Sequence, residues 1–378
     1  MIINNYNQQD KMMKNLHSLL SFREYSNNYK YEELLQESIH KIFLETLHQK
    51  SIPTLCNKIY CSHWITDDLI VYATKDKLLN LYNCRNNKTT LIKDYRTDEE
   101  KNNHEKIAIS TGIKSLDYKN NKLIIAINNN IDMYNLNQFD KFDKINTFKS
   151  HTDWISKIQW VNGGSNILTS SKDQTVKIWN GYGVNTNIYE YEKYDNYCRD
   201  FKFDKFNNKL YCLSSNGVVN FFDVTKRKKY YKIKLKNQEC VVSEYNYLKK
   251  LFVVGTKDSV ILLDTRTKKK SLEIPNMNGN TGTRSLGWYN DNVLSIGGGT
   301  NKLSFYDIRK NSGFIKNDNK NFYNIDKGFI KNDSTYQMVL NSQVSIYTHT
   351  YNSNKNKIFV AGGPTMIGLF GSQMSILQ

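Results

Sequence analysis

The stretch HTDWISKIQWVNGGSNILTSSKDQTVKIWN, residues 151–180, decides the fold class. It holds three short apolar runs with alternating polar residues, and each run is separated from the next by turn-forming residues. This pattern is typical of antiparallel strands. His151, Asp173 and Trp179 are placed so that they can tie such strands together across the turns.

The same pattern recurs at intervals of roughly 40 residues, which indicates a WD-repeat β-propeller, a ring of four-stranded blades. Six further copies occupy residues 57–83, 111–135, 195–223, 240–264, 281–307 and 345–378. We therefore expect an all-β fold, a seven-bladed propeller over residues 51–378. Most copies replace the Trp that ends the third strand by another large apolar residue, namely Tyr82, Tyr134, Phe222, Leu263 or Tyr306.

Two segments depart from this pattern. Residues 1–50 have helical periodicity, with an apolar stripe formed by Leu35, Ile39, Ile42 and Phe43, and predict an N-terminal helical arm. Such a helix could pack on the propeller itself or bind a partner. Residues 310–337 are polar and too long for an ordinary loop, which predicts a mobile insertion.

The composition points to an anionic partner. Lys and Arg number 53 against 36 Asp and Glu, a net charge of +17, although part of this excess is a general abundance of lysine. The six cysteines show no metal-ligand spacing and read as reduced core thiols. We expect no cofactor, no metal, no membrane segment, and a cytoplasmic and nuclear location.

Basic residues recur at equivalent positions of several blades. Counting back four residues from the aromatic that closes each first strand gives Lys114, Arg199 and Arg284, with no acidic residue among the seven copies. The turn between the second and third strands adds Lys75, Lys172 and Lys257. We call these six residues the basic ring. Chance clustering in a lysine-rich chain is the alternative explanation.

The basic ring favours one kind of ligand. Guanidinium groups match carboxylates in bidentate fashion, and a ring around one channel mouth suits a compact anion such as an acidic peptide end. A long nucleic-acid strand would require a basic stripe with stacking aromatics, so we do not expect nucleic acid as its ligand.

Four stretches resemble the DCAF family, the substrate receptors of cullin-4 RING ubiquitin ligases. They are NKIYCSHWI at 57–65, HTDWISKIQW at 151–160, GTRSLGWYNDNVLSIGGGTNKLSFYDIR at 282–309 and SIYTHTYNSNKNKIFVAGGP at 345–364. The resemblance spans roughly residues 55–370. It implies a non-catalytic receptor whose partners are the damage-specific DNA-binding adaptor, the cullin-4 ligase and substrate proteins with acidic C-termini.

The resemblance also assigns residues to adaptor docking. The N-terminal arm and the blade-end Asp-x-Arg boxes would contact the adaptor, and the boxes here are Asp264 with Arg266 and Asp307 with Arg309. Such a pair also occurs in propellers as a purely structural salt bridge within a turn.

Members similar to this chain recognise substrates that end in two glutamates. The matching basic positions are Lys75, Lys172, Arg199 and Arg284, whereas Lys114 and Lys257 rest on the blade register alone. A further basic position of the family is Tyr197 here.

No enzyme motif accompanies these features. The sequence has no Gly-rich phosphate loop, no GxSxG elbow and no metal-spaced histidine pair. A general scaffold propeller and an RNA-binding propeller remain as alternatives to the substrate receptor.

Overall fold

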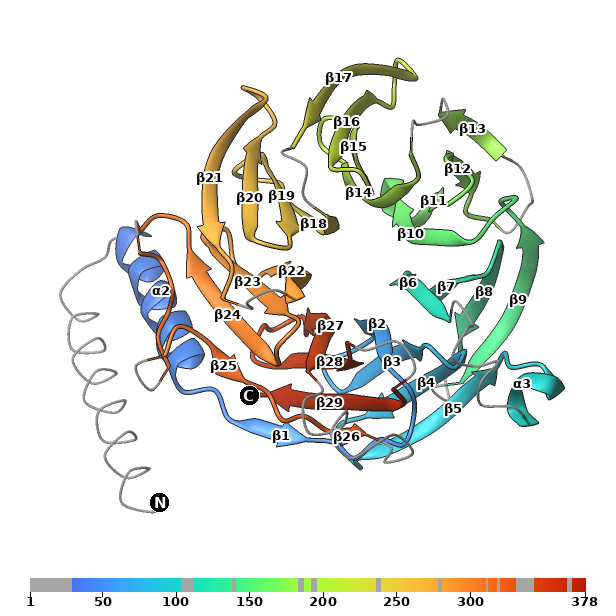
Figure 1. Ribbon diagram of the computed structural model, residues 1–378, viewed down its shortest axis with the longest axis horizontal. Helices are drawn as coiled ribbons and strands as arrows, with labels where there is room; N and C mark the ends of the chain where they lie inside the picture. The colour runs from blue at the N-terminus through green and yellow to red at the C-terminus, as the bar shows by residue number, and fades with distance from the viewer. Residues whose placement is uncertain are drawn as a thin grey trace.

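The protein forms a closed ring of seven antiparallel sheets around a central channel (Figure 1), which confirms the predicted seven-bladed propeller. The computed structural model describes residues 29–102, 112–137, 141–182, 187–191, 196–235, 239–277, 281–310, 312–317, 320–330, 343–365 and 369–378. Among these residues, no helix is both long and apolar enough to cross a membrane.

The first three blades each use four consecutive strands, and the first strand lies nearest the channel. Blade 1 comprises β2 (Ile59–Trp64), β3 (Leu69–Thr74), β4 (Leu78–Asn83) and β5 (Lys88–Asp94). Blade 2 comprises β6 (Ile113–Lys119), β7 (Lys122–Ile127), β8 (Asn130–Leu136) and β9 (Phe142–Lys149). Blade 3 comprises β10 (Ile155–Val161), β11 (Asn166–Ser171), β12 (Val176–Asn180) and β13 (Asn187–Tyr191). A short helix, α3 (Asp98–Asn102), follows blade 1.

The next three blades repeat this order. Blade 4 comprises β14 (Cys198–Asp204), β15 (Lys209–Ser214), β16 (Val218–Asp223) and β17 (Lys228–Lys234). Blade 5 comprises β18 (Cys240–Asn246), β19 (Leu251–Thr256), β20 (Ser259–Asp264) and β21 (Lys269–Pro275). Blade 6 comprises β22 (Thr283–Trp288), β23 (Val293–Gly298), β24 (Lys302–Asp307) and the short β25 (Tyr323–Asn324).

Blade 7 joins the two ends of the ring. Its strands β27 (Val344–Tyr351), β28 (Ile358–Pro364) and β29 (Gly371–Leu377) are followed in space by the N-terminal β1 (Gln49–Ser51), which pairs with β29. Backbone hydrogen bonds between His48 and Gln378, 2.8 and 3.0 Å long, extend this pairing. The strand β1 thus straddles residues 50 and 51, where the sequence placed the boundary between arm and propeller.

The aromatic residues that replace the blade Trp are buried between neighbouring blades. Tyr82, for example, is 1% exposed and packs with Phe359 and Ile376 of blade 7. The strands carry continuous apolar runs because both faces of each sheet contact another blade. All five substitutes named above are buried, as is Trp179 itself.

In blade 3 the polar residues of the opening stretch form one buried network. His151 Nδ1 donates to Asp173 Oδ2 at 2.9 Å, and its Nε2 lies 2.7 Å from Thr169 Oγ1. Trp179 Nε1 donates to the same hydroxyl at 2.8 Å. The turn that carries Lys172 is therefore fixed to the blade by the carboxylate of its neighbour Asp173.

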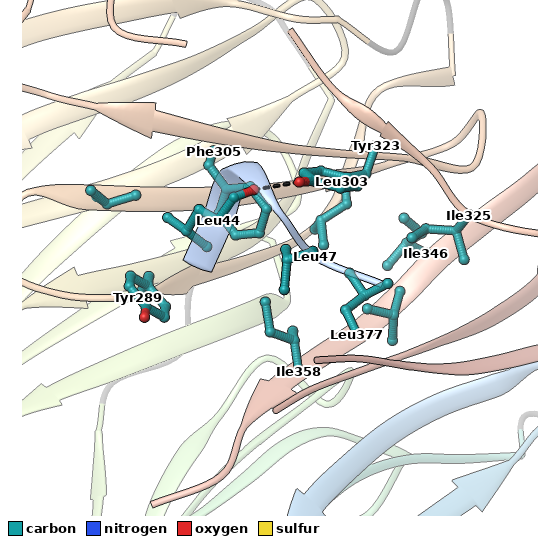
Figure 2. Close-up of a cluster of buried hydrophobic side chains, with 12 residues drawn as sticks. Leu44, Leu47, Tyr289, Leu303, Phe305, Tyr323, Ile325, Ile346, Ile358 and Leu377 are labelled. Atoms are coloured by element: carbon teal, nitrogen blue, oxygen red, sulfur yellow. Dashed lines mark hydrogen bonds between the residues drawn. The ribbon is translucent and has the colours of Figure 1, made fainter. Parts of the chain in front are cut away.

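The helix α2 (Tyr29–Glu45) packs against blade 6 on the outer side of the ring (Figures 1 and 2). Leu44 is 1% exposed among Leu303, Phe305 and Tyr323, and the Tyr323 hydroxyl donates to the Leu44 carbonyl. The end of the helix is thus part of the propeller core.

This packing corrects one expectation about the apolar stripe. Phe43 stacks on Tyr289 of blade 6, with ring centroids 6.0 Å apart, so part of its surface packs on the propeller itself. Ile42 is half-buried, and Ile39 is 43% exposed. Leu35 lies in α2, but its side chain is outside the described residues.

The predicted mobile insertion at 310–337 is also corrected, for the residues that the structure describes. Tyr323 in β25 and the adjacent Ile325 are buried in the core beneath α2. The strand β26 (Phe329–Ile330) pairs with β29. A few apolar residues anchor this polar segment, which composition alone does not reveal; residues 311, 318–319 and 331–337 lie outside the described residues.

Candidate functional site

The innermost strand of every blade bulges at the same position. The register of its pairing shifts at the second residue of the strand in blades 1 to 6 and at the fourth residue in blade 7, so that one residue is skipped. The skipped residues are Tyr60, Lys114, Ser156, Arg199, Val241, Arg284 and Tyr347. These are the seven positions that the sequence register aligned. Because a bulge re-aims a side chain, these residues gather at one mouth of the channel, here called the upper mouth.

The channel below this mouth is a cavity of about 280 Å³ lined by the innermost strands. Tyr60, Lys114 and Tyr347 are among its lining residues, and the rings of Tyr60 and Tyr347 meet edge to face at 5.3 Å. A cavity of this size accommodates a few side chains, not a folded domain.

The turns between second and third strands reach the same mouth. The backbone N–H of Lys75 donates to the Lys58 carbonyl at 2.9 Å, and that of Lys172 donates to Trp154 at 3.0 Å. Each accepting residue lies just before the bulged strand of its own blade. The structure thereby brings the turn lysines of blades 1 and 3 next to the bulge residues.

Lys114 is the electrostatic centre of this group. Burial, together with the positive charges of Arg199, Lys172 and Lys75, lowers the pKa of Lys114 to about 8. Its Nζ lies 3.7 Å from the centroid of the Trp154 ring. In the part of the chain that the structure describes, no carboxylate forms an ion pair with Lys114. Lys114 and these three cations share one small region.

Trp154 contributes an aromatic wall to this region. Lys172 Nζ lies 5.9 Å from the centroid of the same ring, and Tyr197 meets the ring edge to face at 5.8 Å. Cation–π contacts of this kind stabilise ammonium groups without neutralising their charge. Tyr197 thereby supports this tryptophan.

The structure adds Lys58, which the sequence register missed. Lys58 is 3% exposed, and burial followed by the charge of Lys75 lowers its pKa to about 8. Burial also lowers the pKa of Lys75. Lys58 precedes the bulged strand by one residue, so a count restricted to one position per blade passes over it.

The two arginines of the basic ring differ in their contacts. Arg199 Nη1 lies 3.4 Å from the exposed Glu239, a contact that a stronger anion could replace. Arg284 lies near Tyr347, and its Nε is buried with no hydrogen-bond partner among the described residues. An unsatisfied buried N–H donor is costly, so this guanidinium is poised to accept an anionic ligand.

Lys257 is not part of the charge group around Lys114. It is exposed in the β19–β20 turn, and its carbonyl accepts a hydrogen bond of 2.7 Å from Asn276 Nδ2. The members of the basic ring that interact through their charges therefore lie in blades 1 to 4.

The Asp-x-Arg boxes form local salt bridges. Arg266 Nη2 lies 2.9 Å from Asp264, and Arg309 Nη2 lies 2.9 Å from Asp307. A third pair, Asp94 with Arg96 at 2.7 Å, has the same form. This geometry satisfies each arginine within its own turn, as the structural reading of the boxes predicts.

Arg309 has a second contact that Arg266 lacks. Its Nη1 lies 2.5 Å from Glu37 Oε1 of α2, and both carboxylates raise the pKa of the guanidinium. A cavity of about 580 Å³ lies between α2 and blade 6 beside this bridge. The box at 307–309 thus connects the propeller to the helix.

A closed propeller with a cationic upper mouth and an attached helix defines a WD-repeat binding protein. The residues at this mouth are donors that can hold an anion. The chain matches the family model of the DDB1- and CUL4-associated factor 12 beta propeller over residues 44–190 and 185–377, and it belongs to that family.

Proposed function

We propose that this protein is a non-catalytic substrate receptor of a cullin-4 RING ubiquitin ligase. The family description names association with DDB1 and CUL4, which supports the adaptor and the ligase as partners. Residence in cytoplasm and nucleus follows as part of this proposal, and fluorescence microscopy of the tagged protein tests it.

The ligand of the upper mouth is a protein C-terminus that ends in two glutamates. The observation that carries this proposal is the environment of Lys114: burial and the positive charges of Arg199, Lys172 and Lys75 lower its pKa, and no carboxylate among the described residues forms an ion pair with it. Three negative charges, two side chains and one terminal carboxylate, would relieve this repulsion.

Each cation can contribute to affinity. A hydrogen bond to a charged group contributes about 1.5–3 kcal/mol when it is well formed, and an arginine can bind a carboxylate in bidentate fashion. Micromolar affinity corresponds to about 8 kcal/mol in total, so at least three such bonds near the upper end of this range are needed.

Fluorescence polarisation with a labelled peptide ending in Glu-Glu tests this function. Arg199→Glu and Arg284→Glu are each expected to reduce affinity at least tenfold, whereas Lys88→Glu on the outer strand β5 removes an exposed charge far from the mouth and should have little effect. Amidation of the peptide C-terminus should cost as much as either arginine variant. Equal binding of free and amidated peptides would leave only a general basic surface.

Docking on the adaptor is proposed for the exposed side of α2. Ile39 remains available on the helix, while Phe43 and Leu44 hold the helix to blade 6. Deleting residues 1–48 would therefore damage the propeller core as well as the arm. Ile39→Asp, compared with wild type in a pull-down of the adaptor, isolates the docking role; undiminished recovery of adaptor would refute it.

A further inference from the structure

The outer strand of blade 4 is an unusually basic edge. Residues 224–238 hold seven Lys or Arg and no Asp or Glu. Within this segment β17 forms the rim of the ring (Figure 1), and six of its seven residues are exposed. The strand lies far from the channel, so the basic ring does not account for it.

The general abundance of lysine does not explain this edge. The other described outer strands of at least five residues are β5, β9, β13 and β21, and each carries an acidic residue, namely Asp94, Asp143, Glu190 and Glu273. Only β17 among them has none. Lysines on an edge strand also discourage pairing with the edge of another sheet. The other outer strands combine lysines with acidic residues, so this protective role does not explain an edge that has no acidic residue.

The lysines of β17 are not neutralised by the protein. Lys228, Lys229, Lys232 and Lys234 are exposed, and none forms an ion pair in the described ranges. On the neighbouring blade, by contrast, Lys270 lies 2.7 Å from Glu273. The charges of β17 are therefore available to an anion in solution.

Two tyrosines lie between these lysines. The pairing of β16 with β17 shifts so that Tyr230 is skipped, and Tyr230 and Tyr231 both approach Lys268, whose Nζ lies 5.6 and 4.7 Å from their ring centroids. Each tyrosine is 39% exposed, and each contacts Phe221 edge to face. The bulge thus places two supported aromatic rings on one side of a basic strand.

We propose that β17 and the adjacent β20–β21 turn bind single-stranded nucleic acid. Alternate residues of an extended strand lie about 6.8 Å apart, which provides a row of cations for a phosphate backbone. Aromatic rings beside such a row provide stacking surfaces for bases. An anionic membrane would use the charges but not paired rings fixed beside a cation.

This proposal goes beyond the receptor function and is independent of it. On the basis of the sequence, nucleic acid is not expected as the ligand of the channel mouth, because that mouth lacks a linear row of basic residues. The stripe with aromatics that a strand of nucleic acid requires is present on the outer edge of blade 4.

Fluorescence anisotropy with a labelled 15-nucleotide polyuridine and the full chain tests the proposal. One triple variant neutralises β17: K228Q, K232Q and K234Q. A control triple removes the same charge from exposed lysines of other outer strands: K88Q, K93Q and K149Q.

The β17 triple should lose at least tenfold in affinity at low salt, whereas the control triple should change it less than threefold. Each phosphate contact to a single strand contributes about 0.7 to the slope of log affinity against log salt, so the β17 triple should lower that slope by about 2. Tyr231→Leu should reduce affinity at least fivefold and Tyr231→Phe should not, because only the ring is needed for stacking. Arg284→Glu should leave polyuridine binding unchanged.

Two results would overturn the proposal. One is an equal loss of polyuridine affinity in the two triple variants, which would show that binding depends on net charge alone. The other is binding to phosphatidylserine vesicles that depends on β17 while polyuridine binding does not, which would assign the edge to a membrane surface.

Discussion

The attachment of α2 to the propeller predicts a large effect of Leu44→Ala. Leu44 is 1% exposed in a cluster that includes Leu47, Leu303 and Phe305, and truncation of a leucine in such a place costs about 2–5 kcal/mol. Since Leu44 lies at the end of α2 and joins this helix to blade 6, we expect the loss to appear first as undocking of the helix. A loss of about 3 kcal/mol corresponds to a roughly hundredfold larger equilibrium constant for opening of the helix.

Hydrogen exchange of the α2 amides measures this opening directly. The matched control is Ile39→Ala on the same helix, because Ile39 is 43% exposed and surface substitutions usually stay within about 0.5 kcal/mol. Exchange in α2 should accelerate in the Leu44 variant while strands β23 and β24 remain protected. If both variants exchange alike, the helix is not held by this cluster.

Three other perturbations test the fold and the helix contact. Burial lowers the pKa of His349 to about 4 from an ordinary 6.5. The free energy of unfolding should therefore be greatest above about pH 6.5 and fall by about 3 kcal/mol towards pH 4. Denaturant midpoints at pH 7.5 and 4.5 measure this loss, and His349→Gln should lessen the difference between them. Arg309→Ala should accelerate exchange in α2, whereas Arg266→Ala, which breaks only a local pair, should leave α2 unchanged. Asp173→Ala should destabilise the protein by about 1–3 kcal/mol, seen as a lower melting temperature, because it removes the carboxylate that accepts hydrogen bonds from His151, the Thr175 hydroxyl and the Thr152 N–H; an unchanged melting temperature would contradict this role.

The blades could be predicted because their pattern is local and repeated. Alternation, turn residues and the closing residues such as Tyr82 recur with a fixed period, and the same period aligned the bulge residues Lys114, Arg199 and Arg284. Repetition thus gave both the fold and the geometric equivalence of positions around the channel.

Other features depend on contacts that have no period. The strand β1 has the polar sequence QKS and forms only because β29 presents an open edge. Phe43 and Ile39 belong to one helical stripe, yet one is stacked on Tyr289 and the other is exposed, because a stripe does not specify which surface it meets. The pKa of Lys58 is lowered by burial and then by the charge of Lys75, whose backbone N–H donates to the Lys58 carbonyl, and both effects depend on the folded blade.

The pairing of β1 with β29 sets the order in which the protein can mature. Gln49 Nε2 donates to Ser375 Oγ at 2.8 Å across 326 positions of the chain, so the ring cannot close until the ribosome has released β29. Until then blade 7 has an open edge, and part of the core beneath α2, including Ile358 and Leu377, has not yet been synthesised. The helix α2 thus reaches its final position only after β28 and β29 have been synthesised. A translation product that stops before β28 would carry α2 without part of the surface that orients it.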